Sequence, residues 1–525
     1  MTSQKESSCL RYNIVDMKFK MTEQRMLAIN IGSRFVAYTI NMGSNFFLTP
    51  FIVAALGAAP YGYLGLGQNF VSYLDIFTFM TAGMLFRFVM ISHTQKNYKD
   101  TNAYFSSSFY ATMAYLVAIL VPVGYAIWRL QDFIKVDPAI LDDVKILFVL
   151  LMINFIFNTF FLIFRTGTQV ANKFYLVSIR DFFAVVMEAA LLVSLYVFLP
   201  PRIYYLGVSA VVISTFTLVY DYILMKRFLP ELDIRIKNIR WDKFKEITRS
   251  GFYFMVKQIS YIMLVGFDLL FANVFVSPIA MGQLAIAKIL PKAMQSFLSM
   301  ATGSFNVIFT KLYAQKRYDH LVVQVKRGIK VLGTVTMLPN VILIVYGVPF
   351  FKLWIKGQDI PLIYVLSVLT ALVIIMNGLM FPLQSVFTIT NHVKENALVH
   401  LAYGIISIIT TLLFLWFTDY GIYAIAGVST FYGLLLPFVF QMPFAAQCLN
   451  LPKYTFFPLM LKSMITFGAL LLFGFAMSAV YMPTSWLTLI IACGILGLVS
   501  VAVIYFIYFS QDERSHILSV FGIKG

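Results

Sequence analysis

The chain has 525 residues, of which 60% are hydrophobic and only 12% are charged, and its formal net charge is +17. So few charged residues cannot cover the surface of a water-soluble globule of this length, and the composition indicates a protein that lies within a lipid bilayer. The three cysteines are far apart and follow no CxxC spacing, which argues against a disulfide framework or a thiolate metal site. We expect no metal and no cofactor.

Apolar runs of about 20 residues define the predicted order of elements. The first 26 residues carry five basic residues and no long apolar run, which is typical of a cytoplasmic tail rather than a cleaved signal peptide. Six runs follow within 27–225, a basic polar segment covers 226–249, and six further runs lie within 250–446. Two last runs lie within 447–509, before a polar tail at 510–525. The pattern predicts an all-α polytopic membrane protein with about 14 transmembrane helices.

A weak internal repeat relates the two groups of six helices. A shift of 220 residues aligns 61–75 with 281–295 and matches Gly62 with Gly282. Because six spans separate the copies, both copies cross the membrane in the same direction. The sequence therefore predicts two parallel-repeat six-helix bundles followed by two C-terminal helices, with the substrate path in the cleft between the bundles.

The loop charges predict the orientation. If the N-terminus is inside, the inner loops and tails hold about 27 of the 40 Lys and Arg residues, against about six on the outer side. Amphipathic tryptophan rings favour the headgroup layer, and four of them fall at predicted outer ends: Trp128, Trp354, Trp416 and Trp486. We expect a multi-pass protein with both termini cytoplasmic. This asymmetry also accounts for the net charge without a nucleic-acid partner.

The polar segment 226–249 carries eight basic residues interleaved with isoleucine and aromatic residues. Two interpretations remain open for it. It is either an amphipathic helix on the anionic inner leaflet, attracted by about 1 kcal/mol per basic residue, or a solvated linker that follows the charge asymmetry.

Charged residues within the predicted spans are the main functional clue. A charge that faces lipid near the bilayer centre costs roughly 2.5–3.5 kcal/mol, so most of these side chains must face protein or water. Three of them, Arg34, Arg87 and Asp221, lie near inner ends and could instead be interface anchors. The full set is Arg34, Arg87, Arg180, Lys257, Lys288, Lys292, Asp75, Asp181, Glu188, Asp221 and Asp268.

Both repeats present a polar stripe at corresponding places. Lys288 and Lys292 are one helical turn apart, and Gln295 continues their face. Gln68 and Asp75 occupy the corresponding face in the first repeat, together with Ser72. Polar stripes on membrane helices are typical of a surface that faces water or substrate.

Asp268 and Lys288 lie at similar depths on either side of a turn at Ser277, so we expect them to form a buried ion pair. Such a pair either ties two helices together or belongs to the substrate site. Lys292 then lacks a partner and would suit an anionic ligand, with Lys257 as a further cation at another depth.

The fifth span carries Arg180, Asp181 and Glu188. Asp181 and Glu188 are seven residues apart on one helix face and could hold a proton or a cation as a carboxylate pair. Local pairing of Asp181 with Arg180 is the alternative. Arg180 itself is a third candidate cation for an anionic ligand.

Two segments, 30–77 ("NIGSRFVAYTINMG…") and 268–290 ("DLLFANVFVSPIAMGQLAIAKIL"), together with the six-plus-six-plus-two layout, carry a family resemblance over essentially the whole chain. The chain resembles the polysaccharide exporters and O-antigen repeat-unit flippases of the multidrug/oligosaccharidyl-lipid/polysaccharide exporter superfamily. The resemblance implies translocation of an undecaprenyl-diphosphate-linked oligosaccharide across the bacterial inner membrane, by alternating access through a cationic cavity. Cations there would receive diphosphate or acidic sugar: Arg34, Arg180, Lys257, Lys288 and Lys292.

The same resemblance implies a proton or sodium ion as the coupling ion, and a glycan polymerase with its chain-length machinery as partners. Alternatives within the superfamily are a cation-coupled multidrug antiporter, which would call for an acidic cavity, and a lipid II flippase. A membrane glycan polymerase or ligase is an alternative from another class. The longest predicted outer loop, 129–143, is too short for a catalytic domain, and no phosphate-binding or metal-spaced motif is present, so we expect a protein that is not an enzyme.

Overall fold

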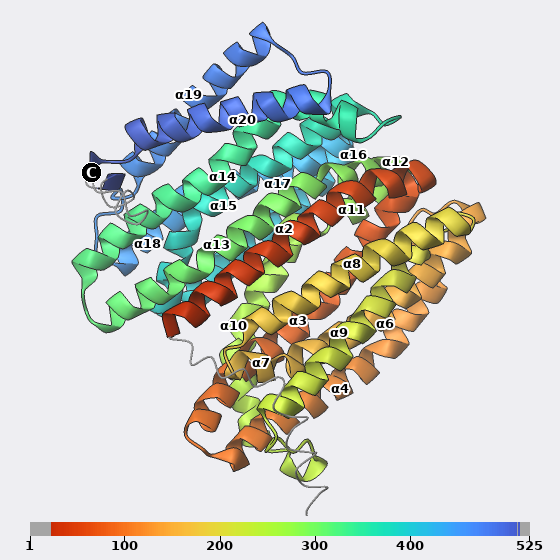
Figure 1. Cartoon of the computed structure of the whole chain (residues 1–525), viewed down its shortest axis with the longest axis vertical. Coiled ribbons are helices and arrows are strands. Elements are labelled where there is room, and N and C mark those ends of the chain that lie inside the picture. The colour runs from red at the N-terminus through yellow and green to blue at the C-terminus, as the bar shows by residue number, and fades with distance from the viewer. Residues whose placement is uncertain (1–22, 512, 515–525) are drawn as a thin grey trace, which may run out of the picture.

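The structure is a computed structural model that describes residues 23–511 and 513–514, and these residues form helices and loops without a β-strand (Figure 1). Lipid offers no hydrogen bonds to the backbone, so apolar runs of this length fold as helices. The long helices are α2 (Glu23–Leu56), α3 (Ala58–Thr94), α4 (Tyr98–Trp128), α6 (Leu141–Phe164), α8 (Phe174–Phe198), α9 (Tyr205–Phe228), α10 (Trp241–Tyr261), α12 (Pro278–Ala287), α13 (Ile289–Ala314), α14 (Tyr318–Trp354), α15 (Ile360–Ile389), α16 (Val393–Phe417), α17 (Ile422–Leu436), α19 (Phe457–Val480) and α20 (Trp486–Val503).

Short helical segments connect or interrupt these helices. They are α5 (Leu130–Phe133), η1 (Pro138–Ile140), α7 (Thr166–Val170), η2 (Ile236–Asn238), η3 (Ile262–Gly266), α11 (Asp268–Phe271), η4 (Ala272–Val276), η5 (Pro437–Gln441), α18 (Met442–Cys448) and η6 (Ile504–Tyr508).

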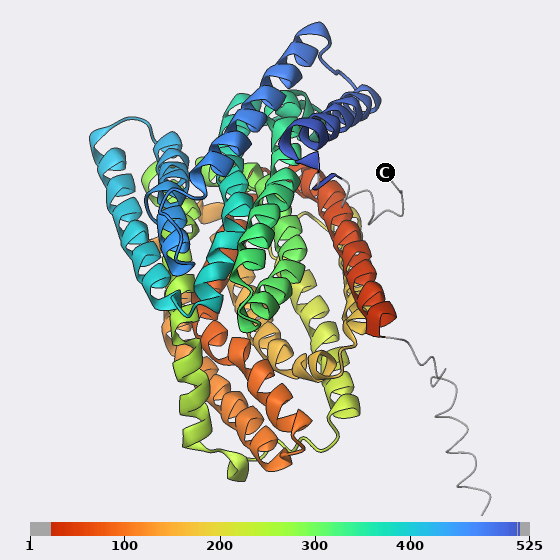
Figure 2. The same ribbon diagram turned by 90° about the vertical axis from the view of Figure 1, so that its left-hand side faces the viewer.

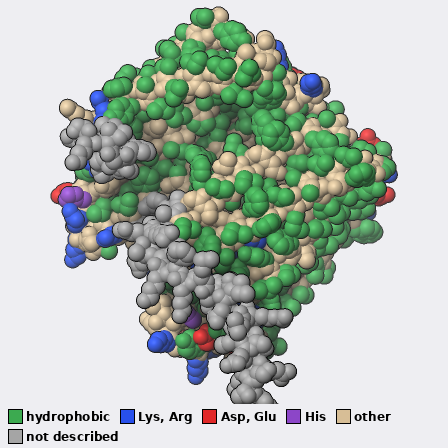
Figure 3. All heavy atoms as spheres, in the orientation of Figure 1, with side chains coloured by type: hydrophobic (Ala, Val, Ile, Leu, Met, Phe, Trp, Pro, Cys, Tyr) green, Lys and Arg blue, Asp and Glu red, His purple; other side chains and the backbone are tan. Residues whose placement is uncertain are grey.

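Twelve helical segments among the described residues are long and apolar enough to cross a membrane. The two further predicted spans correspond to α3 and to the α12–α13 pair. The prediction of an all-α membrane protein with about fourteen spans therefore agrees with the structure. Figure 3 shows that hydrophobic side chains cover much of one face and that most of its charged side chains lie at the margins, as expected for a surface in contact with lipid.

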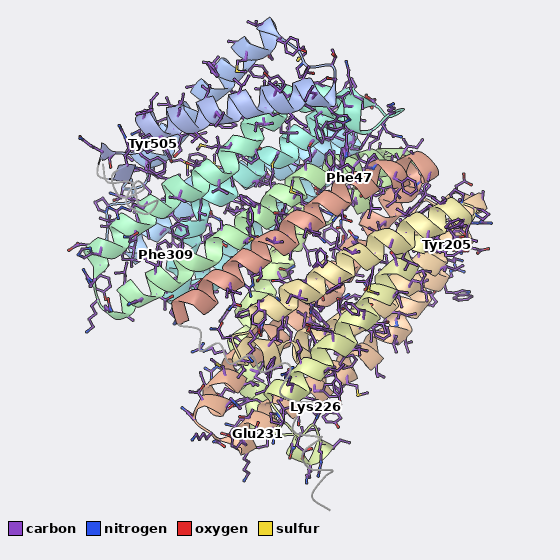
Figure 4. All side chains as sticks on the ribbon, in the orientation of Figure 1. Phe47, Tyr205, Lys226, Glu231, Phe309 and Tyr505 are labelled. Carbon is purple, nitrogen blue, oxygen red and sulfur yellow. The ribbon has the colours of Figure 1, made fainter. Side chains whose placement is uncertain are left out.

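The helices form two groups that lie side by side (Figures 1 and 2). The first group contains α3, α4, α6, α8 and α9, and the second contains α13 to α17; α2 runs between them in Figure 1 and packs on α8. The last two helices, α19 and α20, pack on α14, on the side away from the first group. Figure 4 labels Tyr205 near one end of α9 and Lys226 near the other. We call the side of Lys226 and Glu231 the inner side, and the side of Phe47 and Tyr205 the outer side.

Two consecutive spans are broken near the middle of the chain. The span that contains Asp268 has π-helical turns on both sides of it, η3 and η4. The next span is divided at Lys288, between α12 and α13. Proline lacks an amide hydrogen and clashes with the carbonyl four residues earlier, and the residue four before Pro291 is Ala287, where α12 ends. The break thus follows from the proline that the sequence shows.

The basic segment 226–249 contains no separate amphipathic helix, because its residues from Trp241 onward are the first turns of α10. The part before α10 is docked on α4. The backbone N–H of Arg240 donates to the Ser107 hydroxyl at 2.9 Å, and the Arg240 guanidinium lies 3.0 Å from the Asp100 carboxylate. Ile236 and Trp241 remain 70% and 73% exposed beside these basic residues.

At the outer side, α3 and α12 cross with their backbones in direct contact. A Cβ atom added to Gly282 would lie 2.1 Å from the Ala58 carbonyl oxygen, and one added to Gly62 would lie 2.8 Å from the Gly282 Cα. Only glycine fits at either position. These are the two glycines that the sequence repeat matches with each other. Nearby, the buried Asn273 side chain binds both backbone atoms of Lys135, accepting from its N–H at 2.7 Å and donating to its carbonyl oxygen at 3.0 Å.

Candidate functional site

A cavity of about 680 Å³ lies below this crossing and is the candidate functional site. Its wall is formed by α3 from the first group and, from the second half of the chain, by α10, η3, α11, Lys288, α13, α15, α16, α17 and η5. Three lysines and one aspartate line it, together with seven side-chain amides. These amides are Gln68, Asn69, Gln258, Gln295, Asn377, Gln384 and Gln441.

The predicted ion pair is present in the cavity wall. The Lys288 ammonium lies 2.6 Å from the Asp268 carboxylate, and each side chain is only 10% exposed. The π-helical turn before Asp268 is fixed to α3, because the Tyr73 hydroxyl and the Asn69 amide both donate to the Gly266 carbonyl oxygen, at 2.7 and 2.9 Å. The pair therefore neutralises the one carboxylate of this cavity and anchors the broken span that carries it.

Lys292 lies one helical turn beyond Lys288, is exposed toward the cavity, and has no ion-pair partner within the described residues. The positive charge of Lys288 acts on it from the same wall. The neighbouring Gln295 accepts a hydrogen bond from the Asn377 amide at 3.0 Å, which joins α13 to α15. An unpaired cation beside amide groups is an arrangement that suits an anion with hydroxyl groups.

Lys257 provides a second unpaired cation on the wall formed by α10. Its ammonium lies 3.4 Å from the Gln384 amide oxygen, and it has no carboxylate partner in the described part of the chain. His400 and Gln441 lie in the same region of the cavity, with 2.9 Å between their side-chain nitrogens. Gln384, His400 and Gln441 could not be identified from the sequence, because a single polar residue in an apolar run carries no signal of which helix it meets.

Arg180 lies away from this cavity, in a charged cluster within the first group of helices. It is 3% exposed, and its guanidinium binds the fully buried Asp221 carboxylate at 2.6 Å and the neighbouring Asp181 carboxylate. The interpretation of Asp221 as an interface anchor is wrong, because the residue is enclosed between α8 and α9. The local pairing of Arg180 with Asp181 is present. Arg34 is also outside the cavity, with its guanidinium 4.1 Å from the centre of the Phe174 ring.

The remaining predicted site residues lie in the large cavity, in a smaller cavity of the first group of helices, or outside both. Gln68, Gln295 and Ser72 line the large cavity, as do Lys257, Lys288 and Lys292. Asp75 lies outside it and accepts a hydrogen bond from Thr78 at 3.1 Å. Glu188 lines a separate cavity of about 160 Å³ in the first group, which Gln68 also borders. Asp181 is bound to Arg180 and does not line this smaller cavity, and the carboxylate pair of Asp181 with Glu188 stays a prediction.

No family model matches this chain. Its fold is the one seen in solved flippases and multidrug transporters of the membrane. The chain is similar to a structure titled "Lipid II flippase MurJ, inward closed conformation", with a TM-score of 0.61, 13% identity and coverage of 90% of this chain and 98% of that chain.

It is also similar to an inward-facing multidrug resistance MATE family transporter of the MOP superfamily, with a TM-score of 0.60, 12% identity and coverage of 83% of this chain and 96% of that chain. In sequence, it is 22% identical over 428 residues to the uncharacterized membrane protein EpsK of Bacillus subtilis (strain 168), which covers 82% of this chain and 85% of that protein.

Proposed function

We propose that this protein translocates a lipid-linked oligosaccharide across the membrane through the cavity described above. One observation carries the proposal: the cavity combines two unpaired lysines with seven amides, while its one carboxylate, Asp268, is bound to Lys288. Unpaired ammonium groups bind a diphosphate, and amides exchange hydrogen bonds with sugar hydroxyls. The similarity to the flippase fold supports the same function.

The cationic cavity argues against a multidrug antiporter for cations, although the fold is shared with multidrug transporters. A cationic drug would meet Lys257 and Lys292, and among the described lining residues it would find no free carboxylate to replace its water shell. A lipid II flippase is the second candidate, because the solved structure of one has this fold and lipid II also carries a diphosphate. Proteoliposomes supplied with lipid II, or with undecaprenyl-diphosphate-linked oligosaccharide, distinguish the two.

Lys292 is the residue that we assign to the diphosphate. In proteoliposomes loaded with undecaprenyl-diphosphate-linked oligosaccharide, Lys292→Ala should reduce the rate of translocation about 10- to 100-fold, because a charge-assisted contact of roughly 1.5–3 kcal/mol is lost. The amount of folded protein should not change, since the side chain has no ion-pair partner in the described part of the wall. Lys292→Arg should retain part of the activity.

Lys311→Ala is the matched control, because Lys311 is exposed on the same helix and lies outside the cavity. It should translocate at the normal rate. Normal translocation by Lys292→Ala would show that this lysine does not bind cargo, and failure of the unaltered protein with every diphosphate-linked glycan would overturn the proposed function.

We further propose that transport runs from the inner to the outer leaflet, which requires that the side bearing Lys226 is cytoplasmic. Cysteines placed at Ala139 and Lys237, which are exposed on opposite sides, report this directly. In intact cells, an impermeant thiol reagent should label Ala139→Cys and leave Lys237→Cys unlabelled. The reverse pattern would invert the proposed orientation.

A further inference from the structure

The segment that joins the two groups of helices carries a surface that the proposed translocation does not use. Ile236 in η2 and Trp241 at the start of α10 are largely exposed, and three basic residues near them in the chain are exposed as well: Lys237, Lys245 and Arg249. We call these five residues the Trp241 patch. Large apolar side chains exposed among basic ones are typical of a surface at the boundary between lipid headgroups and water.

Contacts with α4 hold this segment in place. The backbone N–H of Asp233 donates to the Asn102 amide oxygen at 2.9 Å, and the Asn238 amide donates to the Asp233 carbonyl oxygen at 2.7 Å. The backbone N–H of Arg240 donates to the Ser107 hydroxyl. The backbone of the patch is therefore already ordered, so a ligand that binds there does not have to offset the loss of its conformational freedom.

The contact with Ser107 also places the patch at the level of the lipid headgroups. Ser107 and Trp128 are 21 residues apart on α4, which corresponds to about 32 Å along the helix axis. Trp128 is 66% exposed at the outer end of this helix, where its ring suits the outer headgroup layer. The hydrocarbon core of a bilayer is about 30 Å thick. Trp241, which follows Arg240, therefore lies about where the hydrocarbon core ends on the inner side.

One face of α10 continues from the patch into the membrane. Trp241 and Phe252 are eleven residues apart, which is three helical turns, so they share a face, and Lys245 lies on it one turn from Trp241. Phe252 belongs to the apolar segment Gly251–Val276, is 45% exposed and does not line the cavity. This face of α10 is therefore turned toward lipid, and at its inner end Trp241 and Lys245 are turned toward the headgroups.

Carboxylates near the patch are bound to other basic residues. Asp100 on α4 binds Arg240 and Lys243, with 3.0 Å between the charged atoms of each pair, and Asp242 binds Arg240 at 2.8 Å. The three basic residues of the patch have no ion-pair partner within the described residues. The patch thus presents three uncompensated positive charges, which attract anionic headgroups.

We infer that the Trp241 patch binds the headgroups of anionic phospholipids in the leaflet on the inner side. Its three cations contact the phosphates, and the Trp241 ring lies at the boundary with the acyl chains. The same helix carries Gly251, where an added Cβ would lie 2.0 Å from the Met80 carbonyl oxygen of α3, and further on Lys257 in the cavity wall. Bound lipid therefore anchors the inner end of one cavity wall. The inference concerns a surface outside the cavity and does not rest on the proposed function.

The test is quenching of the Trp241 fluorescence by brominated lipids, with the full-length protein in nanodiscs of phosphatidylcholine that contain a minor fraction of phosphatidylglycerol. The bromine atoms are carried on the acyl chains of the phosphatidylglycerol or of an equal amount of phosphatidylcholine. Trp241→Phe gives the signal of the other tryptophans, which is subtracted. Brominated phosphatidylglycerol should quench Trp241 several-fold more strongly, because each basic residue near the surface enriches an anionic lipid about fivefold. Salt at about 1 M should reduce this difference.

A triple variant removes the charges of the patch. With Lys237→Gln, Lys245→Gln and Arg249→Gln combined, the two brominated lipids should quench Trp241 equally, and the protein should fold normally because all three side chains are exposed. Lys316→Gln is the control, because Lys316 is exposed in the turn between α13 and α14, and it should keep the preference. Equal quenching in the unaltered protein, or a preference that persists in the triple variant, would overturn the inference. Absence of quenching by either lipid would also overturn it, because the ring would then face water and suit a soluble partner.

Discussion

Charged side chains serve opposite purposes in the two halves of this molecule. In the first group of helices, Arg180 is enclosed and binds two carboxylates, Asp181 and Asp221. In the cavity, Lys292 and Lys257 face open space with no carboxylate partner among the described residues. A cation that is already neutralised within the fold holds helices together, whereas one that is left unpaired beside a cavity is available to a ligand. Pairing, and not membrane depth, distinguishes the two roles.

The largest expected effect comes from breaking the Arg180 cluster. Asp221→Ala removes one partner of a buried ion pair and leaves Arg180 incompletely neutralised, which should reduce the stability of the protein by roughly 3–5 kcal/mol. Purified protein should unfold at a lower temperature, and less should accumulate in the membrane. The folded fraction should still translocate the lipid-linked oligosaccharide normally.

Asp143→Ala is the control for this variant, because it removes an ion pair with the half-exposed Arg202 on the outer side and should change stability little. If Asp221→Ala kept normal stability and lost translocation, the Arg180 cluster would belong to the functional site and the contrast between the two halves would fail.

The next largest effect is expected from Gly282→Ala, which tests whether the α3–α12 crossing closes the outer end of the cavity. Gly282→Ala places a methyl group 2.1 Å from the Ala58 carbonyl oxygen. The backbones must move apart, at a cost of about 1–3 kcal/mol, and the outer end of the cavity should open. A cysteine at Gln68 should then react with an impermeant thiol reagent from the outer side.

Gly468→Ala on α19 provides the comparison, since a Cβ there meets no atom within 4 Å. It should leave both stability and labelling unchanged. Equal labelling of the Gln68 cysteine in Gly282→Ala and in the parent protein would show that this crossing does not close the cavity.

A smaller effect on stability is expected from the Asp268–Lys288 pair, whose charges lie in the cavity wall but neutralise each other like those of the Arg180 cluster. In a double-mutant cycle, Asp268→Ala and Lys288→Ala should be coupled by roughly 0.5–3 kcal/mol, because removing the second partner relieves the charge left by the first. Unfolding midpoints of the four proteins measure this coupling. Strict additivity would mean that the two charges act independently.

The smallest effect concerns an ion pair at the inner end of the helices. Burial alone would raise the pKa of Glu513, and hydrogen bonds from Lys330 and Ser510 outweigh it, so the pKa lies below its usual value of 4.5. The pair therefore contributes stability above pH 4.5, and this contribution is lost as pH falls through the lowered pKa. Lys330 and Glu513 keep 14% and 12% of their side chains exposed at the end of the helices, so part of the attraction is screened and we expect about 0.5 kcal/mol. Glu513→Gln should remove this part of the pH dependence of the unfolding temperature, and an unaltered profile would show that the pair contributes nothing.

The spans and the Asp268–Lys288 pair could be predicted because both depend on local information. Apolar length gives a helix, and two residues at similar distances from one turn lie at similar depth. The role of Arg180 could not be predicted, because its contact with Asp221 depends on how α8 and α9 are rotated toward each other. Lys257 could be predicted as a cavity cation, but its neighbours Gln384 and His400 could not, since the three residues come from three helices that only the packed structure brings together.

The contact between Gly62 and Gly282 has a consequence for symmetry. The sequence alignment of 61–75 with 281–295 matches these two residues with each other, and in a homodimer equivalent residues touch each other at the two-fold axis. A contact between two matched residues of one polypeptide resembles the self-complementary contact of a symmetric dimer. In a dimer one codon would specify both sides, whereas here two separate codons do. A side chain on either glycine would meet backbone atoms of the other helix, α3 or α12, so neither codon is free to change on its own.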